Sequence, residues 1–270
     1  MFPLRDNVRL ARFPVVTAVL VLANVVAYLL EIRHGGSFFG GPTDSVAVRY
    51  GAIPYELTHP ADHCALITHR LAAGVYGEAV ACQGAASGAL GALTGRAPSQ
   101  PPTALTVITS MFLHGSFLHI FGNMVFLGVF GPTVEDRLGR VRFPAFYLAG
   151  GLVALAAQVL ADPSSTTPTL GASGAIAAVL GGYVLMAPRA RIITLVFIVF
   201  FFTIVEVPAV LLLGFWFLEQ LYLGTAGLTG PVGGGEGVAY FAHVGGFAFG
   251  LLTIGLFAGR TRARRHLPVY

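Results

Sequence analysis

Residues 171–187 read GASGAIAAVLGGYVLMA, and residues 238–258 read VAYFAHVGGFAFGLLTIGLFA. Neither stretch carries a charged residue, so both can enter a bilayer as helices. Small residues recur in them at four-residue intervals: Gly174, Ala178 and Gly182 in the first, Ala242, Gly246 and Gly250 in the second. Such stripes let two membrane helices approach closely. We therefore expect the two helices to pack in parallel, with Gly174 beside Ala242.

The whole chain of 270 residues has the same apolar character. Hydrophobic residues make up 55% of it and charged residues 10%, whereas a soluble domain carries about 25% charged residues. So much apolar surface also excludes a disordered chain. The basic residues, all of them arginine, form no block with interleaved aromatics, which gives no support to nucleic acid as a partner. We expect an all-α polytopic membrane protein in contact with the lipid bilayer.

Uncharged stretches predict six transmembrane helices in one domain that covers 1–270. The first helix is 13–31. Four further spans share the same apolar character: Met111–Val134, Phe143–Ala161, Gly171–Ala187 and Val238–Ala258. The remaining stretch, Ile192–Leu223, is too long for one crossing and too short for two. Either 192–205 lies at the membrane interface and 207–223 crosses, or one tilted helix is kinked at Pro208.

The arginines favour one orientation. Twelve of the sixteen lie before residue 13 or in 135–142, 188–191 and 259–270, which six spans place on one side of the membrane. By the positive-inside rule this side is the cytoplasm. We therefore expect a cell membrane protein with both termini and the basic tail 259–270 in the cytoplasm, and with the polar loop 32–108 outside.

The polar loop contains both cysteines, Cys64 and Cys82. An external compartment permits a disulfide between them, and two free thiols are the alternative. His59, His63, Cys64 and His69 have spacing that could hold a metal, although such clusters are usually only solvated. We expect no metal and no cofactor.

Polar residues inside a bilayer are candidates for function because burying them there is costly. His119 and Asn123 lie four residues apart, so they share one face of a helix, and His114 lies about one turn earlier. They are either donors directed into the bundle or polar contacts between helices. We expect Glu135 and Arg137 to have a structural role, as an ion pair that caps a helix end. Glu206 is either a buried acid or an interfacial one.

Ser173 and His243 form the strongest candidate pair. Ser173 follows the loop-like stretch 162–169, so it lies in the first turn of its helix, where backbone N–H groups lack partners and the helix dipole favours an anion. Each of these residues is next to a small-residue stripe. Docking of the two stripes therefore brings Ser173 and His243 to the same depth in the membrane. A serine hydroxyl needs a base to become a nucleophile, and imidazole is suited to that role. Since no carboxylate is well placed, we expect a dyad.

The order of four motifs resembles the rhomboid family of intramembrane serine proteases. The motifs are H-x4-H-x3-N-M (His114, His119, Asn123, Met124), E-x-R (Glu135, Arg137), G-x-S-G (Gly171, Ser173, Gly174) and A-H-x2-G-x3-G (Ala242, His243, Gly246, Gly250). The resemblance implies a six-transmembrane-helix rhomboid-like bundle with its catalytic core in 109–258. It also implies a serine endopeptidase that cleaves transmembrane segments of other membrane proteins.

Residue roles follow from the resemblance. Ser173 is then the nucleophile and His243 the general base and acid. His119, Asn123 and the Ser173 backbone N–H would bind the oxyanion, His114 would organise the site and Gly171 would allow the tight backbone. Ala177 departs from the pattern of those members that have an aromatic residue there against the catalytic histidine, so another group must orient His243.

Two other functions remain as alternatives. A non-catalytic rhomboid-like protein would bind membrane clients, but such relatives lose the serine or the histidine, and this chain has both. A transporter would show repeated halves and paired charges within the membrane, and the sequence has no internal repeat.

Overall fold

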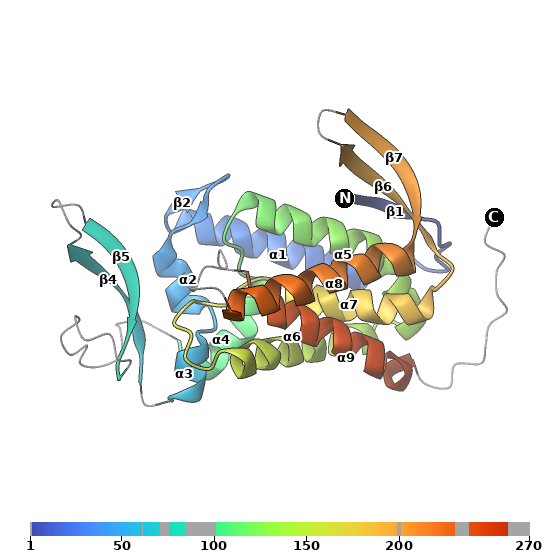
Figure 1. Ribbon diagram of the computed structural model, residues 1–270. Coiled ribbons are helices and arrows are strands. Elements are labelled where there is room, and N and C mark those ends of the chain that lie inside the picture. The colour runs from blue at the N-terminus through green and yellow to red at the C-terminus, as the bar shows by residue number, and fades with distance from the viewer. Residues whose placement is uncertain are drawn as a thin grey trace.

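The computed structural model describes residues 2–60, 62–70, 76–84, 101–198, 201–229 and 238–258. Long helices lie side by side in a bundle, with small sheets at its two ends (Figure 1). The principal helices are α1 (Val15–Arg33), α5 (Phe117–Leu138), α6 (Arg142–Ala161), α7 (Ser173–Met186), α8 (Ala209–Thr229) and α9 (Tyr240–Ala258). Within the described part of the chain, all of these except α7 are long and apolar enough to cross a membrane. A mostly helical membrane protein is therefore confirmed, and a sixth span stays a prediction.

The short helix α7 occupies the centre of the bundle. Every residue from Gly174 to Tyr183 is buried, and α7 packs against α5, α6, α8 and α9. A helix that is apolar on all sides must be surrounded by lipid or by other helices, and α7 is surrounded by helices. This central position explains why α7 has no polar face.

The predicted docking of the two small-residue stripes is confirmed. Gly174 faces Ala242, with a distance of 3.8 Å between the Ala242 Cβ and the place that a Cβ would take on Gly174. Further along, Gly246 lies against the carbonyl of Gly174, and Gly250 against the backbone of Ala178. A side chain at either of these two positions would collide with backbone atoms. Helices α7 and α9 are therefore parallel and touch backbone to backbone.

The segment before α8 corrects the all-α expectation. Strands β6 (Arg191–Ile198) and β7 (Phe201–Pro208) form an antiparallel hairpin. A single helix kinked at Pro208 is therefore wrong, and the helix expected at 207–223 begins at Ala209. Proline lacks the N–H that a helix interior uses, so it favours a break in the helix at Pro208, and the Ile-, Val-, Phe- and Thr-rich sequence before it favours a strand. The apolar content of this segment alone did not distinguish a helix from a strand.

Strand β1 (Phe2–Asp6) completes this sheet in the order β1-β6-β7. The Asp6 carboxylate accepts hydrogen bonds from Thr133 Oγ1 of α5 at 2.7 Å and from Tyr183 OH of α7 at 2.8 Å. The sheet is thus attached to the bundle at the end where α9 finishes (Figure 1). We call this the arginine-rich end, because Arg9, Arg12, Arg140 and Arg189 lie in its segments.

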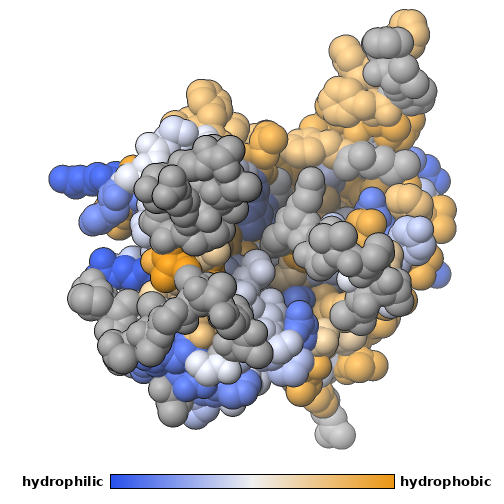
Figure 2. Space-filling model, turned by 60° about the vertical axis from the view of Figure 1, so that its left-hand side comes forward, coloured by the Kyte–Doolittle hydropathy of each residue, from blue (hydrophilic) through white to orange (hydrophobic). Residues whose placement is uncertain are grey.

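The opposite end holds the elements of the polar loop. They are β2 (Gly36–Ser37), β3 (Gly41–Pro42), α2 (Asp44–Tyr50), α3 (Pro54–Thr58), β4 (Cys64–Arg70), β5 (Tyr76–Cys82), α4 (Thr103–Thr109) and the 3-10 turn η2 (Ser110–Phe112). We call α2, α3, β4 and β5 the cap. In a view that brings this end forward, hydrophilic side chains gather around it, while the flanks of the bundle are largely hydrophobic (Figure 2). This distribution fits helices in lipid with the cap in water.

Glu135 and Arg137 each cap a separate helix and do not form the expected pair. The Glu135 carboxylate accepts hydrogen bonds from the backbone N–H groups of Val16 at 2.9 Å and Thr17 at 2.7 Å, in the first turn of α1. Arg137 Nη1 donates to the Met186 carbonyl at 2.9 Å, at the end of α7. Both groups satisfy backbone atoms that have no partner within their own helix. One motif on α5 therefore aligns two neighbouring helices.

The close contact of α7 and α9 makes a prediction about stability. Replacing Gly250 by alanine places a Cβ against the Ala178 backbone, and overpacking of this kind costs about 1–3 kcal/mol. Gly255→Ala is the matched control on the same helix, since a Cβ there meets nothing within 4 Å. We expect a lower midpoint of thermal unfolding in detergent for Gly250→Ala alone. Equal midpoints for the two variants would show that the helices are not in backbone contact.

Candidate active site

Ser173 and His243 lie within hydrogen-bond distance. His243 Nε2 is 2.7 Å from Ser173 Oγ, although the two residues come from the first turns of different helices, α7 and α9. The docked stripes produce this contact, because Gly174 and Ala242 are the immediate neighbours of the two residues and face each other. The arrangement provides a hydroxyl with an imidazole in position to accept its proton.

Gln220 of α8 contacts the other nitrogen of the imidazole. His243 Nδ1 lies 2.6 Å from Gln220 Oε1. Since an amide oxygen can only accept, this contact places the ring proton on Nδ1 and leaves Nε2 free to accept from Ser173. The ring of Trp216, one turn earlier on α8, lies 5.7 Å from the His243 ring at a tilt of 36°. Gln220 and Trp216 thus hold the imidazole, which Ala177 cannot do.

Gln220 was not among the residues predicted from the sequence. It is buried, with an exposed fraction of 7%, and it lies within a helix long and apolar enough to cross a membrane. The rule that selected His119 and Asn123, a polar residue within an apolar span, selects Gln220 as well. The ambiguity of 192–223 hid this signal, since the limits of the span were uncertain there.

The absence of a side chain at Gly171 allows His119 to lie close to Ser173. Its φ of +119° is a conformation that residues with a side chain rarely adopt. A Cβ on Gly171 would lie 2.8 Å from His119 Nε2 and 3.6 Å from Ser173 Oγ. The glycine therefore leaves the space in which the imidazole of His119 approaches Ser173.

His114 and Asn123 place unpartnered polar atoms near these groups. The rings of His114 and His119 are 5.1 Å apart in an edge-on arrangement, and Asn123 lies one turn beyond His119 on α5. Asn123 Nδ2 and His114 Nε2 are buried and have no hydrogen-bond partner among the described residues. A buried polar atom without a partner is costly in a finished core, and these two atoms are therefore candidates for contact with a bound group. His114 is held by its backbone N–H, which donates to Glu31 Oε2 at 3.2 Å.

The loop that leads into Ser173 is bound to the cap. Ala52 and Thr169 exchange two backbone hydrogen bonds, of 3.0 and 2.8 Å. The Tyr55 N–H donates to the Ser165 carbonyl at 3.0 Å, and Thr58 Oγ1 donates to the Pro163 carbonyl at 2.9 Å. The cap thus determines the path of the chain shortly before Ser173.

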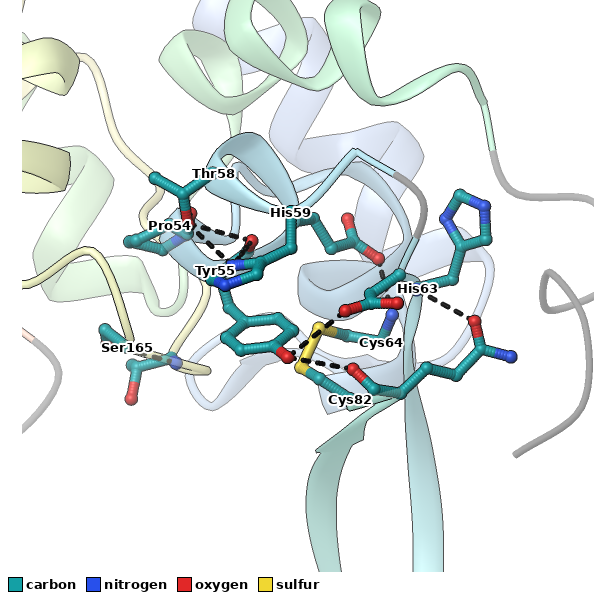
Figure 3. Close-up of a disulfide and its surroundings, with 12 residues drawn as sticks. Pro54, Tyr55, Thr58, His59, His63, Cys64, Cys82 and Ser165 are labelled. Carbon is teal, nitrogen blue, oxygen red and sulfur yellow. Dashed lines mark hydrogen bonds between the residues drawn. A yellow bond between two sulfur atoms is a disulfide. The ribbon is translucent and has the colours of Figure 1, made fainter. Parts of the chain in front are cut away.

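The cap is closed by a disulfide between Cys64 and Cys82 (Figure 3). This bond decides between the two alternatives for the cysteines, and it removes Cys64 from the possible metal ligands. Beside it the Cys64 N–H donates to Glu56 Oε1 at 2.6 Å. Tyr55 OH donates to the Gln83 carbonyl at 3.0 Å. Burial raises the pKa of the Tyr55 phenol, and the nearby Asp62 carboxylate raises this pKa further, so the phenol stays a donor.

The sequence of this core matches a known family. A sequence model of the rhomboid domain matches residues 101–260, more than half of the chain. The chain therefore belongs to the rhomboid family, as its four motifs predicted. The match begins just before α4 and includes all the helices from α5 to α9.

Similar curated proteins carry the same family name. Rhomboid protein 1, mitochondrial, of Saccharomyces cerevisiae is 34% identical over 55% of this chain and 40% of its own length. Presenilin-associated rhomboid-like protein A, mitochondrial, of Danio rerio is 29% identical over 58% of this chain and 39% of its own length. The human Presenilin-associated rhomboid-like protein, mitochondrial, is 28% identical over 57% of this chain and 38% of its own length. This chain spans about two fifths of the length of the relatives it matches.

These names correct the expected location. These three relatives are named as mitochondrial proteins, which contradicts the expected location in the cell membrane. The cytoplasmic assignment of the termini and the external assignment of the polar loop 32–108 lose their basis with it. Arginine distribution distinguishes the two sides of a bilayer, but it carries no information on which cellular membrane is involved.

The disulfide makes a prediction about the loop before Ser173. A cross-link that closes a loop of this size contributes about 3 kcal/mol, so Cys64→Ala/Cys82→Ala should loosen the cap. We expect the amides of Ala52, Tyr55 and Thr169 to exchange with deuterium up to about 100-fold faster. Exchange within α9 is the internal control and should not change. Full protection of Thr169 in the variant would show that the disulfide does not stabilise the contact between the cap and the loop.

Proposed function

We propose that the chain is an intramembrane serine endopeptidase that cleaves transmembrane segments of other membrane proteins. The observation that carries this proposal is the 2.7 Å contact between His243 Nε2 and Ser173 Oγ, with Gln220 on the far side of the imidazole. This arrangement supplies the three parts of an activated nucleophile: a hydroxyl, a base and a group that orients the base. Membership of the rhomboid family supports the same reaction class.

The proposed reaction proceeds by acyl transfer. Ser173 Oγ attacks the carbonyl carbon of the scissile bond while His243 Nε2 takes the hydroxyl proton. The tetrahedral oxyanion accepts hydrogen bonds from His119, Asn123 and the Ser173 backbone N–H, whose position at the start of α7 leaves it without a helical partner. His243 then gives its proton to the leaving amine. Water attacks the acyl-enzyme, again with His243 as base, and Ser173 is restored.

The length of α7 supports a site below the membrane surface. Its 14 residues span about 21 Å at about 1.5 Å per residue, whereas the hydrocarbon core is about 30 Å thick. Arg137 holds the Met186 end of α7 level with the end of α5. If α7 is the sixth span of a single membrane domain covering 1–270, Ser173 then lies roughly 9 Å inside the hydrocarbon layer. The buried polar atoms of His114 and Asn123 would there border a water-filled space.

Substrate transmembrane helices must open before their carbonyl can be attacked, because helical carbonyls are engaged in hydrogen bonds. Small and helix-breaking residues lower the cost of that opening. The proposed partners are accordingly transmembrane proteins with such residues near the cleavage point, presented from the surrounding bilayer. The reaction uses side chains and water, and it needs neither metal nor cofactor.

Cleavage in lipid tests the proposal directly. The purified chain is reconstituted in liposomes with a reporter transmembrane segment, beside Ser173→Ala and His243→Ala. We expect the chain to cut and both variants to lose at least about 1000-fold in rate. A fluorophosphonate probe should label Ser173 in the unaltered chain and not in His243→Ala. If no reporter is cut and Ser173 does not react with the probe, the client-binding alternative replaces the protease.

Gln220 generates a second prediction. Gln220→Ala removes the acceptor of the Nδ1 proton, so the imidazole can turn or take the wrong tautomer. We expect kcat to fall about tenfold or more with KM little changed, since a buried group left without its partner costs about 1–3 kcal/mol. Glu219→Ala is the matched control, because Glu219 is the exposed neighbour on the same helix. Equal kcat values for the two variants would remove Gln220 from the positioning role.

A further inference from the structure

The hairpin of β6 and β7 extends away from the helix bundle. Figure 1 shows that it leaves the arginine-rich end and is directed across the helix axes. Strand β1 pairs with β6 only along Ile192–Leu195, so the outer half of the hairpin has no third strand. We call residues 191–208 the arm. Figure 2 shows it as a hydrophobic projection that stands clear of the bundle.

The arm is apolar on both of its faces. Phe201 and Phe202 are exposed to 79% and 72%, and Ile204 to 60%. Successive residues of a strand point to opposite faces, so the first two rings lie on opposite sides of β7. An antiparallel hairpin in water normally has one polar face. Between Ile192 and Val205 the sequence has no charged residue. Both faces of the arm therefore require an apolar medium.

Charged groups occur only at the base of the arm. Arg191 Nη1 and Glu206 Oε2 form an ion pair of 3.9 Å there, with both side chains more than half exposed. Glu206 is thus an exposed acid at the end of the bundle and not a buried one. Beside this base, a hollow between β1 and α5 has both arginines (Arg5, Arg9) and apolar groups (Val129, Pro132) in its wall. A basic and apolar mixture of this kind is typical of the level of lipid headgroups, whose phosphates bind arginine.

We propose that the arm is a lateral membrane anchor that lies in the interface of the lipid bilayer, with the phenylalanines of both faces among the acyl chains. Its apolar surface continues directly into that of α8, which begins at Ala209 and exposes Leu211 and Phe215 to 64% and 62%. The lipid that surrounds α8 also covers the arm. The arm reaches sideways from the point where α8 enters the membrane.

The backbone determines how deep the arm can lie. In the order β1-β6-β7 strand β7 is an edge strand, so its outer row of N–H and C=O groups has no partner strand. Open sheet edges do not occur within the hydrocarbon core, because nothing there satisfies those groups. At the interface, water and headgroups can do so. The arm is therefore interfacial and does not cross the membrane.

Spin labels placed on the two faces test this inference. Phe201→Cys and Phe202→Cys are labelled separately in the full-length chain, reconstituted in phospholipid vesicles. The native cysteines are joined in a disulfide and do not take up the label. Accessibility to molecular oxygen reports lipid, and accessibility to a water-soluble nickel chelate reports water. Leu218→Cys on α8, 62% exposed, is the lipid reference, and Val141→Cys, 83% exposed between two arginines at the same end, is the surface reference.

We expect both arm labels to collide more often with oxygen than with the nickel chelate, at depths between those of Leu218 and Val141. Nickel access equal to that of Val141 at both positions would place the arm in water and overturn the proposal. Nickel access at only one of the two positions would also overturn it, since one face would then be wet. Dipolar broadening that persists when the vesicles hold few chains, or shielding from both reagents, would show a second copy on the arm instead of lipid.

Discussion

The contact between α7 and α9 is a contact of backbone with backbone, and the positions of the candidate site residues depend on it. Gly246 and Gly250 lie against the carbonyl groups of Gly174 and Ala178. Within a bilayer, lipid is as apolar as the helices, so close packing and not hydrophobic exclusion holds helices together. Because the helices approach so closely where the stripes begin, Ser173 and His243 come within 2.7 Å. A separation larger by 1 Å would end that hydrogen bond.

Different elements of the fold hold Ser173 and His243 in position. Helix α7 is held at its end by Arg137 and near that end by Asp6, which binds Tyr183, while the cap holds the loop before its start. His243 takes its position from α9 and its orientation from Gln220 and Trp216 of α8. Precise placement of reactive groups requires support of this kind behind them. Much of that support comes from outside the four motifs that identify the family.

The sequence was informative where one physical rule applied to a clear pattern. Residues with four-residue spacing and polar residues within apolar spans pointed to Ser173, His243, His119 and Asn123, because a helix turns regularly and the bilayer penalises polar groups. The same rule also selects Gln220, but this residue was missed because the span that contains it had uncertain limits. Apolar content did not reveal the arm, because Ile, Val and Phe serve equally well in a membrane helix and in a strand. The pairing of the cap with the loop at Thr169 joins residues more than a hundred positions apart, and no local pattern signals such a pairing.

The order of the helices along the chain has a consequence for biosynthesis. Ser173 and His243 are 70 residues apart, and α9 is the last helix that the structure describes. A growing chain that has inserted α1 to α8 already contains the serine, the cap and Gln220, but it lacks His243 and leaves the face of α7 that packs on α9 uncovered. Ser173 meets His243 only when α9 packs against that face. Assembly of the bundle and completion of the candidate site are therefore coupled, because a chain without α9 holds Ser173 apart from His243.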